Sequence, residues 1–402
     1  MTKLALALFS LLAFPSLLLA QGAVWRAAAE AFFAEAQADS VVGSALVLVR
    51  DGKVVAERYD GFADRERGQR ESAATIQHWA SITKTLTAIG VMQLEEHGLI
   101  SLDDPVVRFV PELRDIHADS GDIERITIRM LLSHTGGFRN GTWPFGSGAA
   151  WEPFEPTEWA QLVAMFPYTQ LVLSPGERYS YSNPAYIYLA KVIERVTGDP
   201  WEEYVHKNIF QPLGMAHSYF RGTPWYLREN RGSGYSVVRD SAREAGGLPS
   251  ASDAARRLRV RANSREFDPG VTVPNSGWNA PIGDLVKYVA FLTGSAPNEA
   301  VLTRATLGEM WTAAAPTGTA SYDSDPRNSI GLGFFLFERG GRTLVGHTGD
   351  QGGYRSLLYL DPERHVAAIG VWNTDNPADG RASAERLRRA QEAVLQALTS
   401  LR

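Results

Sequence analysis

Hydrophobic and polar positions follow two different periods along the chain, which predicts a protein that mixes helices and strands. Residues 24–38 have the spacing of an amphipathic helix. Residues 43–50 (GSALVLVR) and 53–63 (KVVAERYDGFA) are predicted to be strands, because they flank an Asp-Gly pair that is typical of a two-residue hairpin turn. Helical spacing returns over 81–96. The first hundred residues therefore predict a helix, a hairpin and a second helix.

The middle of the chain is dominated by helical spacing, and its last part by strands. Residues 101–220 carry several helical patterns, and 221–279 are irregular and rich in Gly, Arg and Ser. Residues 281–313 are helical again, with Pro281 suited to a first turn. A last helix is predicted over 381–400. Four strand patterns with short connections come before it, and these are expected to be antiparallel neighbours: 330–338, 341–348, 353–360 and 365–373.

The strand patterns lie at the two ends of the chain, and the helical patterns lie between them. This order predicts an α/β (α+β) fold, with an antiparallel sheet built from both chain ends, flanking helices and an inserted, mostly helical subdomain. We expect one domain over 21–402. Its α/β part would comprise about 24–100 and 280–402, and its helical insert about 101–279.

The first twenty residues have the composition of an export signal. They carry one cation, Lys3, then an apolar run interrupted by Pro15, and they end on Ala20. This pattern predicts a secretory signal peptide over 1–20 that is cleaved before Gln21, and hence a periplasmic or secreted protein. An uncleaved anchor is the alternative, but the run is short for a membrane span. No later segment approaches about 18 unbroken apolar residues, so no stable membrane anchor is expected after cleavage.

Composition excludes several classes of function. Cysteine is absent from the 402 residues, which excludes disulfides, thiol catalysis and thiolate metal sites. The eight histidines show no His-Glu-x-x-His or His-x-His spacing, so neither a metal site nor a cofactor is expected. The formal charge of −5 gives no basic excess that would indicate a nucleic-acid partner. No Gly-x-Ser-x-Gly elbow is present, which argues against an α/β-hydrolase. The expected partner is a small-molecule or peptide substrate.

Ser81 and Lys84 stand three residues apart at the start of the helix predicted over 81–96. Positions i and i+3 share one face of a helix, so the hydroxyl and the amine are expected to lie together. The helix start favours a developing anion, and burial of Lys84 would disfavour its charge. A neutral amine could then accept the serine proton and activate the hydroxyl. The alternative is a capping serine beside a lysine that extends to solvent.

Two further segments carry candidate chemistry. Tyr181 and Asn183 directly precede a predicted helix, where Tyr181 could be a second proton carrier. Asn183 could hold a substrate carbonyl or orient the lysine, and an ordinary helix cap is the alternative for this segment. His347, Thr348 and Gly349 end a predicted strand, where the glycine would let a substrate backbone approach closely. The alternative for this second segment is an ordinary glycine-rich turn.

Taken together, Ser-Ile-Thr-Lys at 81–84, Tyr-Ser-Asn at 181–183 and His-Thr-Gly at 347–349 resemble the serine β-lactamase and penicillin-binding protein superfamily. The resemblance is to its branch of class C β-lactamases, DD-peptidases and related esterases. Three motifs in the right order are far more specific than any one of them. Further segments also resemble this branch, namely RMLLSHTGGF (129–138), QPLGM (211–215) and PNSGWNAPIGDLVKYVAFL (274–292).

The resemblance implies an acyl-enzyme mechanism. Ser81 would be the acylated nucleophile, and Lys84 and Tyr181 would share the general acid/base work. His347 would supply polar support beside Tyr181. The implied substrate ligands are Asn183, Thr348 and Gly349. The implied oxyanion hole uses the backbone N–H groups of Ser81 and Asp350.

Two features qualify the resemblance. A second His-Thr-Gly, at 134–136, follows a predicted helix and is interpreted as a structural turn. His347 stands where most class C β-lactamases carry lysine, and an imidazole that is largely neutral near pH 7 attracts a β-lactam carboxylate less than a lysine would.

Six aromatic residues crowd one loop region, where local packing is expected and a pocket for the acyl side of the substrate is the alternative. They are Phe138, Trp143, Phe145, Trp151, Phe154 and Trp159.

The expected function is that of an exported, cofactor-independent serine hydrolase. It would act through a Ser81 acyl-enzyme on small amides or esters, with D-amino-acid peptides favoured as in DD-carboxypeptidases. Carboxylesterase activity and class C-like β-lactamase activity are the enzymatic alternatives. Outside the enzymes, the alternative is a penicillin-binding or sensing protein without turnover.

Overall fold

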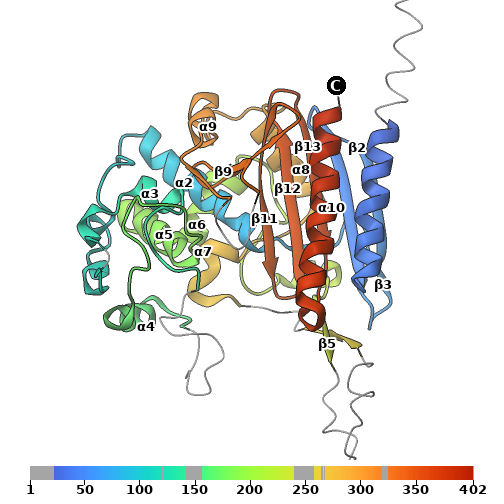
Figure 1. The fold of residues 1–402 in the computed structure, drawn as a ribbon, viewed down its shortest axis with the longest axis horizontal. Coiled ribbons are helices and arrows are strands. Elements are labelled where there is room, and N and C mark those ends of the chain that lie inside the picture. Colours follow the sequence, from blue (N-terminus) through green and yellow to red (C-terminus); the bar gives the residue numbers. More distant parts are fainter. Residues whose placement is uncertain are drawn as a thin grey trace, which may run out of the picture.

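A nine-stranded antiparallel sheet lies at the centre of the protein, in the order β3-β2-β1-β13-β12-β11-β10-β9-β8 (Figure 1). The structure is a computed structural model that describes residues 22–119, 121–141, 156–239, 258–263, 266, 268–318 and 325–401. The strands of the sheet are β1 (Gly43–Arg50), β2 (Lys53–Asp64), β3 (Gln69–Arg70), β8 (Ala315–Pro316), β9 (Asn328–Ile330), β10 (Phe335–Arg339), β11 (Arg342–Gln351), β12 (Tyr354–Asp361) and β13 (Val366–Trp372).

The two ends of the chain meet where β1 pairs with β13. The pairing is antiparallel and runs from Ser44 opposite Trp372 to Arg50 opposite Val366. On its other side β1 pairs with β2 through the Asp51-Gly52 turn, where both residues have positive φ values of 48° and 71°. A two-residue hairpin turn with two positive φ values suits the twist of the strands. The predicted hairpin and the predicted sheet built from both chain ends are therefore confirmed.

Side chains on β1 alternate between two buried layers. Ala45, Val47 and Val49 belong to the larger core, whereas Leu46 and Leu48 belong to a second core on the opposite face. Both faces of a central strand are covered, which explains why this strand reads as a nearly continuous apolar run.

Helices cover both faces of the sheet (Figure 1). The helix over residues 22–38 and α10 (Gly380–Ser400) form the second core with the sheet. α8 (Ile282–Thr293) packs against β13, β1 and β12. α2 (Thr83–Glu96) lies between α5 and α7 and is buried over its whole length from Thr83 to Leu94. The mixed fold class is confirmed.

Most remaining helices are short. The α-helices are α3 (Ile128–Leu132), α4 (Trp159–Val163), α5 (Asn183–Thr197), α6 (Trp201–Val205), α7 (Val273–Ser276) and α9 (Arg304–Met310). The 3₁₀ turns are η1 (Ala80–Ile82), η2 (Val106–Arg108), η3 (Pro111–Asp115), η4 (Ile123–Arg125), η5 (Phe166–Tyr168), η7 (Trp225–Asn230), η9 (Gly270–Thr272) and η10 (Pro377–Asp379), and η6 (His206–Phe210) is a π-helical turn. The division of the chain into an α/β part and a helical insert stays a prediction.

The structure corrects three sequence-based boundaries. The strand predicted over 330–338 is divided into β9 and β10, because the chain turns at Gly333, whose φ is +80°. The helix predicted from Ser81 begins at Thr83, and Ser81 itself lies in the preceding 3₁₀ turn. Pro281 is the residue before α8 and ends a short strand, rather than lying in the first helical turn.

The segment 221–279, predicted to be irregular, contains strands. β5 (Tyr235–Arg239) and β6 (Leu258–Ala262) pair antiparallel, and β14 (Thr374–Asp375) adds a parallel partner to β5. β4 (Ile76–His78) pairs with β7 (Asn279–Pro281). Only alternate positions of β5 are buried and β6 is mostly exposed. The alternation of apolar and polar residues in LRVRA, the sequence of β6, is a strand signal that the sequence interpretation overlooked.

Among the helices that the structure describes, none is both long enough and apolar enough to cross a membrane. The predicted signal peptide over 1–20 lies outside the described residues.

Candidate active site

Ser81 lies in the turn that joins β4 to α2. The preceding residue, Ala80, has φ +47°, a left-handed conformation that costs an L-residue about 1–2 kcal/mol. Neighbouring contacts hold this turn in place. The Trp79 N–H donates to Trp278 O (2.9 Å), and the Ser356 hydroxyl on β12 donates to Trp79 O (3.1 Å). The strained turn therefore presents Ser81 from a fixed position beside the sheet.

Lys84 lies one turn later, in the first turn of α2, and is completely buried. Its Nζ atom is 3.1 Å from Ser81 Oγ, 2.7 Å from Asn183 Oδ1 and 2.9 Å from Asn275 O. Burial lowers the pKa of Lys84 well below its usual value, because the charged form loses its hydration. In the described part of the chain no carboxylate forms an ion pair with it. The predicted proximity of the hydroxyl and the amine is confirmed.

The hydrogen bonds of Lys84 suit a neutral amine. Such an amine has two N–H donors and one lone pair, and both Asn183 Oδ1 and Asn275 O can only accept. The orientation of the Asn183 amide follows from its other end, since Nδ2 donates to Asn140 Oδ1 (3.1 Å). In the neutral amine both N–H groups are used in this way and the lone pair faces the Ser81 hydroxyl, whereas in the ammonium form the third N–H donates to Ser81 Oγ. The neutral arrangement allows Lys84 to accept the serine proton.

Tyr181 lies beside Lys84, just before α5. The centre of its ring is 4.9 Å from Lys84 Nζ, and the side chain is half-buried. α5 begins at Asn183, and the Ser182 side chain caps it by accepting from Ala185 N (3.2 Å). Two candidate groups, a phenol and a carboxamide, are thus held on either side of a helix cap. The structure therefore brings together four residues that the sequence singled out: Ser81, Lys84, Tyr181 and Asn183.

The His-Thr-Gly motif at 347–349 lies on β11, along the edge of the site. β11 pairs with β10 only from Arg342 to Gly346, so within the described residues that edge has no partner strand beyond this point. A Cβ at Gly349 would lie 2.4 Å from Trp79 O and 3.0 Å from Ala80 Cβ. Glycine is therefore required by contact with the Ser81 turn itself, a reason that the sequence interpretation did not include.

Thr348 and Asp350 flank this contact. Thr348 is half-buried, and its carbonyl oxygen accepts from the side chain of the preceding residue. Asp350 directly follows Gly349, in the stretch of β11 that packs against the Ser81 turn. An oxyanion hole made by the N–H groups of Ser81 and Asp350 stays a prediction, as do the substrate contacts of Thr348 and Gly349.

His347 lies beside Tyr181, with ring centroids 6.4 Å apart, and is 1% exposed. Burial and, secondarily, the nearby Lys84 lower the pKa of His347 to about 3. Its Nδ1 atom is 2.6 Å from Thr348 O, which can only accept, so Nδ1 carries the hydrogen. His347 is therefore a neutral imidazole whose Nε2 presents a lone pair.

Sequence reasoning missed three contributors to the site. The backbone carbonyl of Asn275 accepts from Lys84, and Asn140 orients Asn183. The turn at 134–136 follows α3, as predicted, but its histidine ring packs on Tyr181 with centroids 4.4 Å apart. The residue type of Asn275 gives no signal, because its carbonyl belongs to the main chain. The other two contacts join segments that are distant in sequence.

The aromatic residues near this turn divide into two groups. Phe138 is buried against Tyr188, and Trp159 packs edge-on against Phe166 and Tyr188. For these two residues the expected local packing is confirmed. The other four candidates for a pocket lie outside the described residues: Trp143, Phe145, Trp151 and Phe154.

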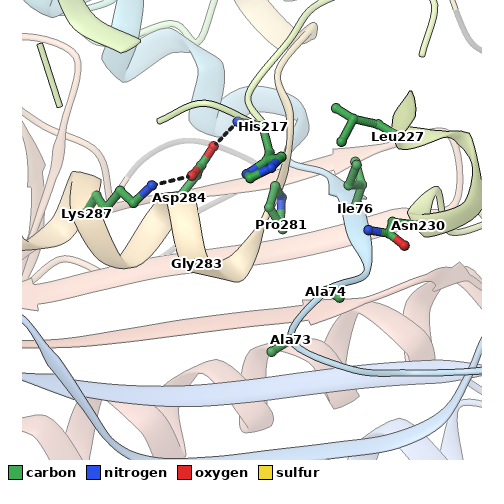
Figure 2. Close-up of a pocket in the computed structure, with 10 residues that line it drawn as sticks. All are labelled: Ala73, Ala74, Ile76, His217, Leu227, Asn230, Pro281, Gly283, Asp284 and Lys287. Carbon is green, nitrogen blue, oxygen red and sulfur yellow. Dashed lines mark hydrogen bonds and ion pairs between the residues drawn. The ribbon is translucent and has the colours of Figure 1, made fainter. Parts of the chain in front are cut away.

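A cavity of about 260 Å³ lies beside the β4–β7 pair (Figure 2) and contains none of the candidate catalytic residues. Three of its lining residues are joined by hydrogen bonds. Asp284 accepts from the His217 N–H (2.8 Å) and from Lys287 Nζ (3.1 Å). The lining residues are Ala73, Ala74, Ile76, His217, Leu227, Asn230, Pro281, Gly283, Asp284 and Lys287.

The chain is similar to known proteins over part of its length. Over its matched part the chain is 32% identical to Esterase EstB of Burkholderia gladioli, covering 59% of this chain and 61% of that protein. It is 33% identical to the putative penicillin-binding protein PbpX of Bacillus subtilis, covering 44% and 41%. The matched part is thus less than two thirds of either relative.

The fold is also similar to that of solved structures. The octameric penicillin-binding protein homologue from Pyrococcus abyssi superposes with a TM-score of 0.69 at 25% identity, covering 93% of this chain and 77% of that one. A model of the Beta-lactamase family matches residues 29–393, most of the chain. The protein with the Ser81, Lys84 and Tyr181 cluster therefore belongs to the beta-lactamase family.

Proposed function

We propose that this protein is a serine hydrolase that cleaves small esters and amides through an acyl-enzyme on Ser81. The observation that carries the proposal is the environment of Lys84. Its amine is buried, its pKa is lowered, and two acceptor-only oxygens take its N–H groups beside the serine hydroxyl. A lysine whose pKa is lowered by burial is more readily neutral, and a neutral amine next to a hydroxyl can act as the base that makes it a nucleophile.

The reaction runs in two halves. In the first, Ser81 Oγ bonds to the substrate carbonyl carbon while its proton passes to Lys84 Nζ. The tetrahedral intermediate then collapses, the bond to the leaving alcohol or amine breaks, and that group receives the proton through Lys84 or Tyr181. In the second half water attacks the acyl-enzyme and gives up a proton to the same groups. Ser81 regains its hydrogen and the carboxylic acid departs.

The neutral state of His347 bears on the choice of substrate. A fixed cation at this position would attract a carboxylate on the acyl donor, and an imidazole with a pKa of about 3 supplies no such charge at neutral pH. This favours donors without a carboxylate beside the scissile bond. Esters and simple amides are therefore ranked ahead of penicillins, and the similarity to EstB supports the ester arm.

D-Amino-acid peptides are the second candidate substrate. The observation in their favour is the similarity to two proteins described as penicillin-binding proteins or their homologues. A binding or sensing role without turnover is the third reading. A complete set of nucleophile, base and phenol argues against it, because binding alone does not need a buried neutral lysine.

We also infer that the protein is exported. The inference rests on the sequence of residues 1–20, with its single cation, its apolar run and Ala20 before the expected cleavage point. N-terminal sequencing of the protein recovered from the producing cell tests it. A mature chain that begins at Gln21 supports export with cleavage. An intact N-terminus in the membrane fraction supports the uncleaved anchor, and an intact chain in the cytoplasmic fraction contradicts export.

The function is tested by turnover and intact-protein mass spectrometry with three probes: a p-nitrophenyl ester, a D-alanyl-D-alanine peptide and a fluorescent penicillin. We expect ester turnover and an acyl adduct that maps to Ser81. Ser81→Ala should lose both while keeping its thermal melting temperature. An adduct on Ser133 would overturn the assignment. Stable penicillin labelling without turnover of any probe would favour the binding protein.

A further inference from the structure

One histidine holds the peptide groups on both sides of Tyr181. The Ser180 N–H donates to His134 O (2.8 Å), and the Ser182 N–H donates to His134 Nδ1 (3.0 Å). The imidazole also lies over the phenol, with ring centroids 4.4 Å apart and an angle of 30° between the planes. His134 therefore contacts Tyr181 with its ring face and holds the two neighbouring residues, Ser180 and Ser182, with its carbonyl and its ring nitrogen.

Tyr181 needs such support because it lies outside regular structure. Residues 179–182 form neither helix nor strand, so no ladder of hydrogen bonds fixes their backbone. A buried backbone N–H without a partner is costly, and side chains supply the partner where secondary structure does not. His134 supplies both partners from the turn after α3, which is distant in sequence and packed in the core.

The hydrogen bond from Ser182 determines the state of the imidazole. A backbone N–H can only donate, so His134 Nδ1 must present a lone pair and the hydrogen must be on Nε2. His134 is buried, at 1% exposure, and burial lowers its pKa well below the usual value. The ring is further enclosed by Tyr186 (5.0 Å) and Tyr179 (5.9 Å). The acceptor is thus kept neutral and in one orientation.

We propose that His134 is a positioning residue for Tyr181: it holds the two peptide groups that flank the phenol and so sets the place of the phenol beside Lys84. The inference rests on the proposed function, in which Tyr181 transfers protons. A displacement of about 1 Å in a catalytic group can cost about 10²-fold in rate, so the effect of losing this support is measurable.

The backbone of His134 allows a matched pair of variants. Its φ is +55°, a conformation that Asn and Gly tolerate better than other residues. In His134→Asn, Oδ1 stands the same number of bonds from the main chain as Nδ1 and can accept from Ser182. In His134→Gly the acceptor and the ring are both lost. The two variants therefore share backbone tolerance and differ in the acceptor.

The measurement is the single-turnover acylation rate with p-nitrophenyl acetate, together with the melting temperature. We expect His134→Asn to stay within about tenfold of the wild-type rate and His134→Gly to lose about 10²-fold. Equal acylation rates in the two variants would overturn the proposal, whatever their melting temperatures.

A double-mutant cycle with Tyr181→Phe separates positioning from general destabilisation. If His134 acts through Tyr181, then adding His134→Gly to Tyr181→Phe causes no further loss of rate. If the two losses multiply, His134 acts independently of Tyr181 and the proposal is wrong. A Tyr181→Phe variant at the wild-type rate would contradict the proton-transfer role of Tyr181 and this inference with it. An acyl adduct on Ser81 would still support the hydrolase.

His365 provides the control. His365 lies in the turn between β12 and β13 and also has a positive φ, of +54°. Its Nδ1 atom is 2.6 Å from Thr293 O. His365→Gly therefore removes a hydrogen-bonded histidine at the same kind of backbone position. We expect it to change the melting temperature and leave the acylation rate at the wild-type value. A loss as large as that of His134→Gly would show that destabilisation alone explains the result.

Discussion

Lys84 Nζ and Asn183 Oδ1 are 2.7 Å apart, although Lys84 lies in the first turn of α2 and Asn183 is the first residue of α5. This contact joins two of the three motifs found in the sequence. In this contact one N–H of Lys84 donates to the Asn183 amide oxygen, which can only accept. The protonation state of Lys84 thus depends on the chemical nature of residue 183, and this dependence can be tested.

Asn183→Asp should raise the pKa of Lys84. A carboxylate at this distance stabilises the ammonium form, whereas the present amide oxygen leaves burial as the main influence. In a plot of acylation rate against pH, we expect the rise on the acid side (the acid limb) to move to higher pH by at least about one unit. The rate at pH 7 is then lower than that of the wild type. The measurement is the single-turnover rate of ester acylation from pH 5 to pH 10.

Asn183→Leu is the matched control for size without charge. It leaves one Lys84 N–H without its acceptor, so the maximal rate should fall, but no carboxylate is present to raise the pKa. The acid limb should therefore not move to higher pH. If both variants move the acid limb upward equally, the electrostatic explanation is wrong.

Lys84→Arg should nearly abolish acylation. Guanidinium stays protonated at any working pH, so it cannot accept the Ser81 proton even if it fills the same space. We expect less than about a tenth of the wild-type acylation rate, a loss of more than about 1.4 kcal/mol in transition-state stabilisation. A variant that keeps a larger share of the rate would remove Lys84 from the role of base.

Gly349→Ala should disrupt the site from the strand side. The added Cβ would lie 2.4 Å from Trp79 O and 2.5 Å from Ser356 Oγ, so β11 and the Ser81 turn must separate. We expect acylation to fall by about 10²-fold, because a shift of about 1 Å at a reacting centre has this effect. Gly283→Ala is the control, since a Cβ there meets no atom within 4 Å. A wild-type rate for Gly349→Ala would show that the contact is not needed.

His347 should make folding stability depend on pH. Its folded pKa is about 3 and its ordinary value is 6.5, so between these values the unfolded chain binds a proton that the folded protein does not. The free energy of unfolding therefore decreases as the pH falls from 6.5 towards 3, by about 1.4 kcal/mol per pH unit for this one group. Above pH 6.5 the effect is absent.

The test is urea unfolding of the wild type and of His347→Gln between pH 4.5 and pH 7. The variant should have the shallower dependence on pH, by about one proton. His206→Gln removes an exposed histidine, which is in solvent in both states, and should leave the dependence unchanged. Identical slopes for wild type and His347→Gln would contradict a buried neutral imidazole.

Asp39 should be important for stability and unimportant for the chemistry. It is 1% exposed and accepts from Arg355 (3.2 Å), Arg386 (2.9 Å) and Asn376 (3.0 Å). Asp39→Asn removes the charge that compensates two arginines, and we expect the free energy of unfolding to fall by about 3–5 kcal/mol. Acylation measured well below the melting temperature should be retained.

The control for this change is Asp60→Asn. Asp60 is 61% exposed and lies 3.6 Å from Arg58, so its ion pair is expected to contribute about 0–1 kcal/mol. A loss of stability for Asp39→Asn no greater than that for Asp60→Asn would contradict the importance of the buried cluster.

Sequence patterns were sufficient where one face of an element is buried. The N-terminal helix and α10 have a clear period because each packs one side against the sheet. The β1–β2 hairpin was predicted from its Asp51-Gly52 turn, where both residues have positive φ. β5 and β6 were missed, although LRVRA in β6 alternates apolar and polar residues, because each strand has only five residues and few buried positions. The division of β9 from β10 follows from one glycine with a positive φ, which periodicity does not detect.

The site could be assembled from sequence only through its resemblance to a known superfamily. Spacing within a helix explains why Ser81 and Lys84 are neighbours, but it says nothing about Tyr181 or His347. The contacts that set the state of the amine and hold the phenol are long-range. One of them uses the main-chain carbonyl of Asn275, which any residue type could provide.

The pairing of Ser44 with Trp372 has a consequence for how the chain folds. The N-terminal hairpin is complete early in synthesis, yet the strand that covers the free edge of β1 comes from the last part of the chain. Contacts so distant in sequence must overcome the loop-closure entropy before they contribute, which slows folding. Until β13 arrives, β1 exposes an apolar edge that can pair with other chains, so the period before completion is when the protein is most prone to aggregate.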